Sequence, residues 1–151
     1  MTRRINIGCG PYRIDGNDWV NIDANPRWRP DIVRDIRRGL PFDDSSCGEV
    51  LTSHFLEHLA SDDLIFLVGE IYRVLAPDGL WKILAPLGCT GDLDHKMIFA
   101  DDSFDVLLRP ESANYYQLHM RWEEVAGSRG IRQEPTRPHI ASLHLVLRAV
   151  K

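Results

Sequence analysis

An apolar segment that ends in two glycines lies near the start of the chain, and a second apolar segment that ends in a carboxylate follows closely. The first is Ile5-Asn6-Ile7-Gly8-Cys9-Gly10 and the second is Trp19-Val20-Asn21-Ile22-Asp23. Glycine has no Cβ, so the backbone at Gly8 and Gly10 can come into contact with a ligand. A carboxylate at the end of the next strand can accept hydrogen bonds from the hydroxyls of a ribose. Together the two segments predict one half of a nucleoside pocket.

Length and composition favour a single domain that spans residues 1–151. Of the 151 residues, 44% are hydrophobic and 26% are charged, a balance typical of globular proteins with a buried core. The three cysteines are odd in number and scattered, which predicts neither a disulfide framework nor a zinc site. No apolar run reaches the ~20 residues that span a bilayer. We therefore expect a cytoplasmic protein with reduced thiols and no membrane partner.

The charge of the chain argues against general binding of nucleic acids. The formal net charge is −4, whereas most nucleic-acid binders are basic. Arginines are concentrated in residues 1–40, where they could steer an anionic substrate. The alternative is a solvated face on which these arginines pair with nearby aspartates.

Apolar and turn-forming segments alternate along the chain. We expect a helix with Ser61 as its N-cap and with Asp62 and Asp63 in its first turn, ended by Pro77-Asp78-Gly79. A helical turn is expected at residues 54–59 and a short helix between residues 101 and 108. Strands are expected at residues 4–8, 19–23, 31–35, 48–53, 80–85, 114–120 and 140–150.

Strands that alternate with crossovers predict an α/β, Rossmann-like fold with a mostly parallel sheet and an antiparallel closing strand. Ligands of such sheets bind at the carboxyl ends of the strands, near the switch point. Six polar or glycine residues fall at these ends in the expected sheet. They are Gly8, Gly10, Asp23, Asp35, Ser53 and His54.

The spacing of the motif residues argues against a dinucleotide. A dinucleotide fingerprint needs a third glycine and an acidic residue about 20 positions further on. Here Pro11-Tyr12-Arg13 follows Gly10, and Asp23 comes too early for a full intervening helix. No glycine-lysine-serine loop for phosphates is present either. The pocket therefore suits a nucleoside without a pyrophosphate.

Several blocks of residues occur in an order known from one enzyme family. They are Asn6-Ile7-Gly8-Cys9-Gly10, Trp19-Val20-Asn21-Ile22-Asp23, Asp35, Leu40-Pro41-Phe42-Asp43-Asp44-Ser45, Ser53-His54-Phe55-Leu56-Glu57-His58-Leu59 and Glu70-Ile71-Tyr72-Arg73-Val74-Leu75-Ala76-Pro77-Asp78-Gly79. In these blocks the chain resembles the class I S-adenosylmethionine-dependent methyltransferases, in particular their small, type-11-like members. The resemblance covers roughly the first 86 residues.

The resemblance implies S-adenosyl-L-methionine as cofactor, S-adenosyl-L-homocysteine as product, and a role for each matching residue. The backbone of Gly8, Cys9 and Gly10 would pass the methionine end of the cofactor, and Asp23 would bind the ribose. Asp35 and Ile36 would lie beside the adenine. Ser53 and His54 would close the pocket under the sulfonium.

The chain departs from this family where only about eight residues separate Gly10 from Trp19, too few for the usual helix. We therefore expect a reduced fold that lacks the N-terminal helices and leaves the cleft open on one side. A second subunit in a homodimer, or the substrate, would cover it. Asp78-Gly79 replaces a commoner glycine pair, and one glycine still permits a positive φ.

His54 and His95 are the candidate catalytic residues, because both follow expected strands on the same rim. His54 would act as a general base toward a hydroxyl nucleophile, or else cap the following turn or pack on the adenine. Glu57 and His58 would orient each other or hold the turn. Asp92, Asp94 and His95 lack a diagnostic metal spacing, so no metal site is expected. Cys9 would be a space-filler.

Three hypotheses about function remain open at this point. The first is a methyltransferase that acts on an O or N atom of a small-molecule or glycan acceptor. The second is a catalytically degenerate methyltransferase fold that serves as a binding module or a partner subunit. The third is another nucleoside-binding enzyme on the same sheet, such as a dehydrogenase or an epimerase.

Overall fold

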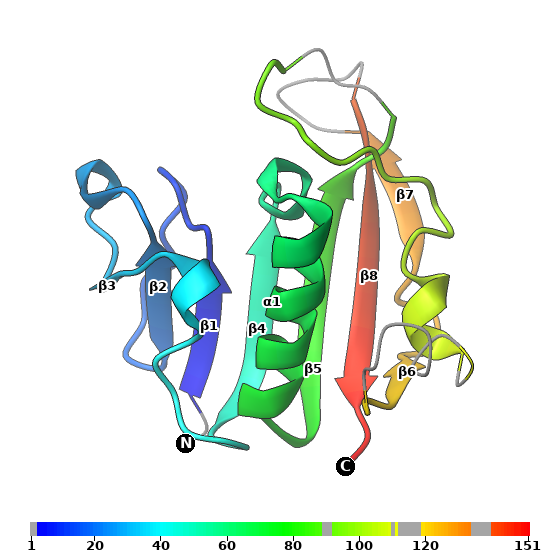
Figure 1. Ribbon diagram of the computed structural model, residues 1–151, viewed down its shortest axis with the longest axis horizontal. Coiled ribbons are helices and arrows are strands. Elements are labelled where there is room, and N and C mark those ends of the chain that lie inside the picture. Colours follow the sequence, from blue (N-terminus) through cyan, green and yellow to red (C-terminus); the bar gives the residue numbers. More distant parts are fainter. Residues whose placement is uncertain (1–2, 89–91, 110, 112–118, 134–139) are drawn as a thin grey trace.

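The computed structural model describes residues 3–88, 92–109, 111, 119–133 and 140–151 of the chain. They form a sheet against which one long helix, α1 (Ser61–Val74), is packed (Figure 1). Four short 3-10 helices are η1 (Pro26–Trp28), η2 (Ile36–Arg38), η3 (Leu56–His58) and η4 (Asp105–Leu108). The strands are β1 (Arg3–Ile7), β2 (Trp19–Asp23), β3 (Ile32–Val33), β4 (Cys47–Ser53), β5 (Leu75–Pro86), β6 (Trp122–Glu124), β7 (Gly130–Gln133) and β8 (Ala141–Ala149).

The strands lie in the order β3-β2-β1-β4-β5-β8-β6, and β7 also pairs with β8. Strands β1 to β5 are parallel to one another, whereas β8 runs antiparallel to β5. In Figure 1 the arrows of β4 and β5 point upwards and that of β8 points downwards. The predicted Rossmann-like α/β sheet with an antiparallel closing strand is confirmed.

The connections in the first part of the chain are too short for α-helices. Residues 8–18, all of which are described, contain only turns and bends between β1 and β2. The three-residue helices η1 and η2 take the place of crossover helices before and after β3. An isolated helix needs many more residues to be stable, so these segments stay as loops. The predicted reduced form of the fold is confirmed.

Helix α1 packs its apolar stripe against the sheet. Leu67, Val68, Ile71 and Val74 are buried at intervals of three or four residues, which places them on one side of the helix. The predicted N-cap is wrong by one residue, because Ala60 holds that position and no side chain caps the helix. Among the helices described, none is long and apolar enough to cross a membrane.

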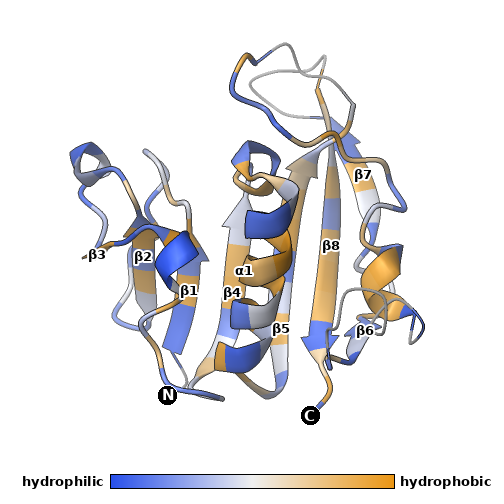
Figure 2. Ribbon diagram, viewed as in Figure 1, coloured by the Kyte–Doolittle hydropathy of each residue, from blue (hydrophilic) through white to orange (hydrophobic). Residues whose placement is uncertain are grey.

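An aromatic cluster joins α1, β5 and β6 on the helical side of the sheet. The Trp122 ring lies 5.2 Å from Tyr72 of α1 and 5.6 Å from Trp81 of β5. Phe104, just before η4, lies 6.2 Å from Trp81 in an edge-on contact. Such pairs add to the free energy gained by apolar burial alone. Figure 2 shows that β8, which lies between β5 and β6, is also hydrophobic along most of its length.

The other side of the sheet carries charged side chains, because successive residues of a strand point to opposite faces. The Glu49 carboxylate of β4 forms ion pairs with Arg4 of β1 at 3.2 Å and with Lys82 of β5 at 2.9 Å. The Arg4 guanidinium also lies over the ring of Trp19. Since α1 is the single α-helix among the described residues, this polar face has no helical layer against it.

Several predicted boundaries differ from the structure. Strand β3 is shorter than the predicted 31–35, because Asp35 already caps η2. Strand β5 begins at Leu75, five residues before the predicted start, and Asp78 rather than Gly79 adopts the positive φ of 62°. No sequence pattern indicated β6 or β7. The strand predicted at 114–120 falls largely on residues outside those described.

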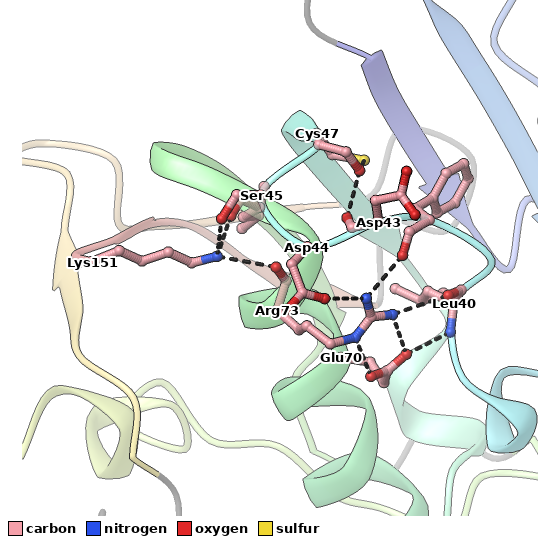
Figure 3. A network of polar contacts seen from close by, with 11 residues as sticks. Leu40, Asp43, Asp44, Ser45, Cys47, Glu70, Arg73 and Lys151 are labelled. Carbon is pink, nitrogen blue, oxygen red and sulfur yellow. Dashed lines mark hydrogen bonds and ion pairs between the residues drawn. The ribbon is translucent and has the colours of Figure 1, made fainter.

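A polar network ties the end of α1 to the loop before β4 (Figure 3). The carboxylate of Glu70 binds Arg73 and accepts a hydrogen bond of 2.7 Å from the backbone N–H of Leu40. Arg73 also donates to the carbonyl oxygens of Leu40 and Phe42. Lys151 completes the network by donating to the carbonyl oxygen of Arg73. The network therefore connects the helix, the loop and the last residue of the chain.

The guanidinium of Arg73 lowers the pKa of Glu70 below its ordinary value of 4.5, and the hydrogen bond from Leu40 adds to this effect. A carboxylate with a lowered pKa in the folded state stabilises the fold above its unfolded pKa. That contribution is lost as the pH falls through the lower folded-state value.

We expect Glu70→Gln to lower the free energy of unfolding by about 1–3 kcal/mol at neutral pH, because it removes the charged acceptor of several hydrogen bonds. The difference from the wild type should shrink as the pH falls through the lowered folded-state pKa of Glu70, because Glu70 itself then becomes protonated. Urea unfolding over a series of acidic pH values and at neutral pH measures this. The control is Glu123→Gln, which breaks an exposed pair with Arg121 and should cost below about 1 kcal/mol. Equal effects of the two variants would contradict the prediction.

Candidate cofactor-binding site

A cavity of about 270 Å³ lies at the carboxyl ends of the parallel strands. The chain leaves β1 toward β2 and β3 and returns to β4 on the other side of β1, so this is the switch point of the sheet. Gly8, Asp23, Asp35 and Ile36, which the sequence predicts for the cofactor, all line the cavity. The other lining residues are Ala24, Arg34, Arg37, Phe55, His58, Leu59, Asp63 and Lys96.

The two glycines after β1 have different physical roles. Both adopt positive φ angles, 66° at Gly8 and 50° at Gly10, a conformation that other residues rarely adopt. A Cβ on Gly8 would lie 2.1 Å from the ring of Phe55, so the ring packs directly on the glycine. A Cβ on Gly10 would meet no atom within 4 Å. Gly8 therefore allows the contact with Phe55, and Gly10 leaves open space beside its backbone.

Asp23 holds the glycine loop in place through both of its carboxylate oxygens. Its Oδ2 accepts a hydrogen bond of 2.9 Å from the Gly10 N–H, and its Oδ1 accepts one of 2.8 Å from the Asn25 N–H. A carboxylate offers about four acceptor positions, so about half of them stay available to a ligand. Asp23 can therefore shape the loop and still accept hydrogen bonds from a ribose.

Asp35 and Ile36 form another wall of the cavity at the start of η2. The Nε of Arg37 donates hydrogen bonds of 3.0 Å to both carboxylate oxygens of Asp35. These bonds and the backbone N–H of Arg37 lower the pKa of Asp35 to about 2. The carboxylate therefore stays ionised at neutral pH and can accept a hydrogen bond from an amine. Ile36 is buried and presents an apolar surface.

Cys9, Gly10, Ser53 and His54 do not line this cavity, so their assignment to the cofactor stays a prediction. Cys9 is buried, and its backbone N–H donates to the carbonyl oxygen of Ile22. Burial raises the pKa of its thiol, which keeps the sulfur protonated and unreactive. Ser53 ends β4 two residues before Phe55, which does line the cavity.

The candidate catalytic residues His54 and His95 lie on either side of a buried carboxylate, that of Glu57. The Nδ1 atom of His54 lies 3.7 Å from Glu57 Oε1, and the Nε2 atom of His95 lies 4.0 Å from the same oxygen. His54 adopts a positive φ of 48°, a strained conformation for a residue with a side chain. On its other side, His54 Nε2 lies 3.5 Å from the hydroxyl of Ser142.

His58 connects this group of side chains with the cavity. Its ring lies 4.9 Å from the ring of His95, edge to face, and His58 also lines the cavity. Glu57 is only 1% exposed, and this burial raises the pKa of its carboxyl group. We refer below to Glu57, His58 and His95 as the Glu-His cluster.

Sequence reasoning did not assign the other lining residues to the cofactor, and Phe55 and Lys96 are two examples. Phe55 was expected only as part of a helical turn, although an aromatic residue directly after the strand-end His54 is a local signal. Lys96 follows the candidate His95, and its backbone N–H donates to the carbonyl oxygen of Glu57 at 2.7 Å. That contact joins segments 39 residues apart, and no local pattern could have indicated it.

The comparison with protein families gives one match. Residues 17–83 match the family model described as a methyltransferase domain. This part of the chain is similar to that methyltransferase domain. The matched segment runs from just before β2 into β5 and therefore includes Asp23, Asp35 and the Glu57-His58 pair. No curated protein matches the sequence.

Solved structures share the fold of this chain at low sequence identity. A Burkholderia thailandensis 1,6-didemethyltoxoflavin-N1-methyltransferase is 13% identical, with a TM-score of 0.67 over 99% of this chain and 72% of the other. A SAM-dependent methyltransferase from Archaeoglobus fulgidus is 18% identical, with a TM-score of 0.61 over 99% and 86%. Phosphoethanolamine N-methyltransferase 1 from Haemonchus contortus is 13% identical, with a TM-score of 0.73 over 99% of this chain and 39% of the other.

These findings confirm the resemblance to the class I S-adenosylmethionine-dependent methyltransferases. The solved structures establish the fold, and the family match supports the predicted methyltransferase and its S-adenosylmethionine cofactor. Which atoms of this chain touch the cofactor, and which acceptor it serves, are separate questions that depend on the site.

We expect Gly8→Ala to lower the free energy of unfolding by about 1–3 kcal/mol more than Gly10→Ala does. Both variants place alanine at a positive φ, but only the methyl group at position 8 overlaps the ring of Phe55. Urea unfolding of both variants, of Phe55→Ala and of Gly8→Ala/Phe55→Ala measures the coupling. The double variant should recover part of the loss. Additive losses would show that Phe55 does not pack on Gly8.

Proposed function

We propose that this protein is an S-adenosylmethionine-dependent methyltransferase that acts on an O or N atom of a small-molecule or glycan acceptor. The observation that carries the proposal is the gathering of Gly8, Asp23, Asp35 and Ile36 around one cavity at the switch point of the sheet. Three separate strand ends supply these residues, and each residue type suits one part of an adenosyl cofactor.

The residues around the cavity fit the cofactor on physical grounds. Open space beside Gly10 leaves room for the methionine portion, because nothing lies where a Cβ would be. Asp23 keeps about half of its acceptor positions for the two ribose hydroxyls. The ionised carboxylate of Asp35 would accept a hydrogen bond from the adenine amine, and Ile36 would pack on the ring.

S-adenosylmethionine supplies a methyl group activated by its positively charged sulfur, so the protein itself mainly provides proximity and alignment. His54 and His95 would serve the acceptor, since an imidazole can take the proton of a hydroxyl or an amine. Glu57 would orient both imidazoles from between them, at 3.7 and 4.0 Å. His58, whose ring contacts that of His95, lines the cavity and would link these imidazoles to the cavity wall.

A small-molecule acceptor agrees with two of the solved structures. They are named as a 1,6-didemethyltoxoflavin-N1-methyltransferase and a phosphoethanolamine N-methyltransferase, each in complex with its small molecule and S-adenosylhomocysteine. Arg34, Arg37 and Lys96 line the cavity of this chain and would favour an anionic group on the acceptor.

A second candidate function is a binding or partner subunit without catalysis, and the reduced fold favours it. Crossover helices are replaced by loops and by η1 and η2, and the face with Arg4, Glu49 and Lys82 has no helical layer. A partner subunit or a second copy of the chain would cover such surfaces.

Thermal unfolding with S-adenosylhomocysteine, with NAD and without ligand separates these functions. A ligand at 100 times its dissociation constant should add about 2.7 kcal/mol to the free energy of unfolding. Stabilisation by S-adenosylhomocysteine alone supports the proposed methyltransferase. Stabilisation by NAD alone would favour a dinucleotide enzyme, and no response to either would favour the partner subunit.

We expect Asp23→Ala to weaken the binding of S-adenosylhomocysteine by about 1–3 kcal/mol, because it removes a charged acceptor. Isothermal calorimetry on the wild type and the variant measures the change. Asp62→Ala is the matched control, since Asp62 is an exposed carboxylate of α1 that does not line the cavity. Unchanged affinity of Asp23→Ala would refute the placement of the ribose.

We expect His54→Ala to reduce turnover more than it reduces cofactor affinity, because its proposed role is to accept a proton from the acceptor. Methyl transfer from labelled S-adenosylmethionine to an acceptor found by screening gives kcat, and calorimetry gives the affinity. His119→Ala, at an exposed histidine, is the control. Equal losses in turnover and affinity would make His54 a binding residue.

A further inference from the structure

We propose that Glu57, His58 and His95 form a binding site for one divalent transition-metal ion. Each residue of this Glu-His cluster offers one ligand atom, and these atoms all lie within 4.8 Å of one another. The sequence predicts no metal site, because the pair Glu57-His58 and His95 are far apart along the chain and show no recognisable spacing.

The buried carboxylate of Glu57 is the feature that calls for a cation. Its Oε2 atom is buried and has no hydrogen-bond partner, and the side chain is only 1% exposed. Buried polar groups nearly always have partners, since an unpaired buried charge is costly. Its Oε1 atom faces two histidines only at the long distances of 3.7 and 4.0 Å. A metal ion between Glu57 and the imidazoles would satisfy the carboxylate.

The ligand types select the class of metal. Two imidazoles and one carboxylate suit zinc, manganese, iron or cobalt, whereas magnesium and calcium prefer oxygen ligands. In a tetrahedral site with bonds of about 2.1 Å, the ligand atoms lie about 3.4 Å from one another. The ligand atoms of the cluster lie within 4.8 Å of one another, so they would move closer together by up to about 1.4 Å when an ion binds.

Two further carboxylates lie beside the histidines. Asp94 Oδ2 lies 3.2 Å from His58 Nδ1, and Asp92 Oδ2 lies 3.6 Å from His95 Nε2. Asp92 approaches the same His95 nitrogen that faces Glu57, so it lies on the side of the imidazole where an ion would bind. With Glu57 they add negative charge around the cluster, which further favours a cation.

The backbone holds the two halves of the cluster together without a metal. The carbonyl oxygen of Glu57 accepts hydrogen bonds from the N–H groups of Lys96 and Met97, at 2.7 and 3.0 Å. The loop that carries His95 is thereby fixed against η3, which carries Glu57 and His58. A site held in this way loses little conformational entropy when an ion binds.

The position of the cluster suggests what the ion would do. His58 belongs both to the cluster and to the wall of the cavity, so the ion would lie beside the proposed cofactor. With the ion bound, His95 would be a ligand and not a base, and His54 alone would take the proton of the acceptor. The ion would bind the acceptor oxygen and lower the pKa of its hydroxyl. This role, unlike the metal site itself, rests on the proposed methyltransferase function.

Metal titrations test the site without any methyl acceptor. The full chain is stripped with a chelator and titrated by calorimetry with Zn²⁺, Mn²⁺, Co²⁺ and Mg²⁺ separately. We expect one equivalent of a transition metal to bind with micromolar or tighter affinity and to raise the melting temperature, and Mg²⁺ to bind more weakly. Absence of saturable binding, or a preference for Mg²⁺, would overturn the proposal.

Variants locate the bound ion. Glu57→Gln, His58→Ala and His95→Ala should each weaken metal binding at least tenfold, and the visible spectrum of bound Co²⁺ should change. His119→Ala, at an exposed histidine that is not in the cluster, should bind like the wild type. Equal binding by all variants would place the ion elsewhere and overturn the proposal. If Glu57→Gln does not fold, the two histidine variants decide.

The binding of S-adenosylhomocysteine is measured in the same preparations with and without metal. Metal binding without cofactor binding would support the metal site and refute the proposed function. Cofactor binding without metal binding would refute the metal site and support the proposed function.

Discussion

The hydrogen-bonded register of β1 against β2 and β4 positions the whole candidate site. Ile7 pairs with Ile22 on one side and with Thr52 on the other, so the three strands end at nearly the same level. The residues that follow are the glycine loop, Asp23 and the turn with Phe55. A shift of one strand would separate Asp23 from the Gly10 N–H that it binds. The cavity therefore depends on the parallel pairing more than on any single side chain.

The contacts that stabilise the fold and the candidate ligand-binding site lie at opposite ends of the parallel strands. The Arg73-Glu70 network joins the end of α1, the loop before β4 and Lys151 where the parallel strands begin. The candidate site lies where those strands end, among strained or unsatisfied groups such as His54 and Glu57. Between these two ends, the aromatic cluster around Trp81 packs against the sheet. This separation lets the fold keep such costly groups at the site, because the contacts that stabilise it lie elsewhere.

The proposed cofactor pocket and the Glu-His cluster adjoin each other at His58 and Phe55. On one side are the glycines and carboxylates that suit an adenosyl cofactor, and on the other is the Glu-His cluster with its buried carboxylate. Phe55 packs on Gly8 and lines the cavity, while the preceding residue, His54, faces Glu57. One short turn after β4 therefore links the proposed cofactor pocket to the proposed acceptor side.

The sequence by itself determined where β1 to β5 and β8 lie along the chain, the reduced connections and the polar residues at strand ends, because apolar runs, turn residues and their spacing are local properties. It placed β2 and α1 within one residue, and it indicated Gly8, Asp23, Asp35 and Ile36 before their common cavity was known. Only the tertiary structure decided that Phe55 covers Gly8, that His95 reaches Glu57, and that β6 and β7 extend the sheet. These features depend on contacts between segments far apart in the chain, and no local pattern encodes them.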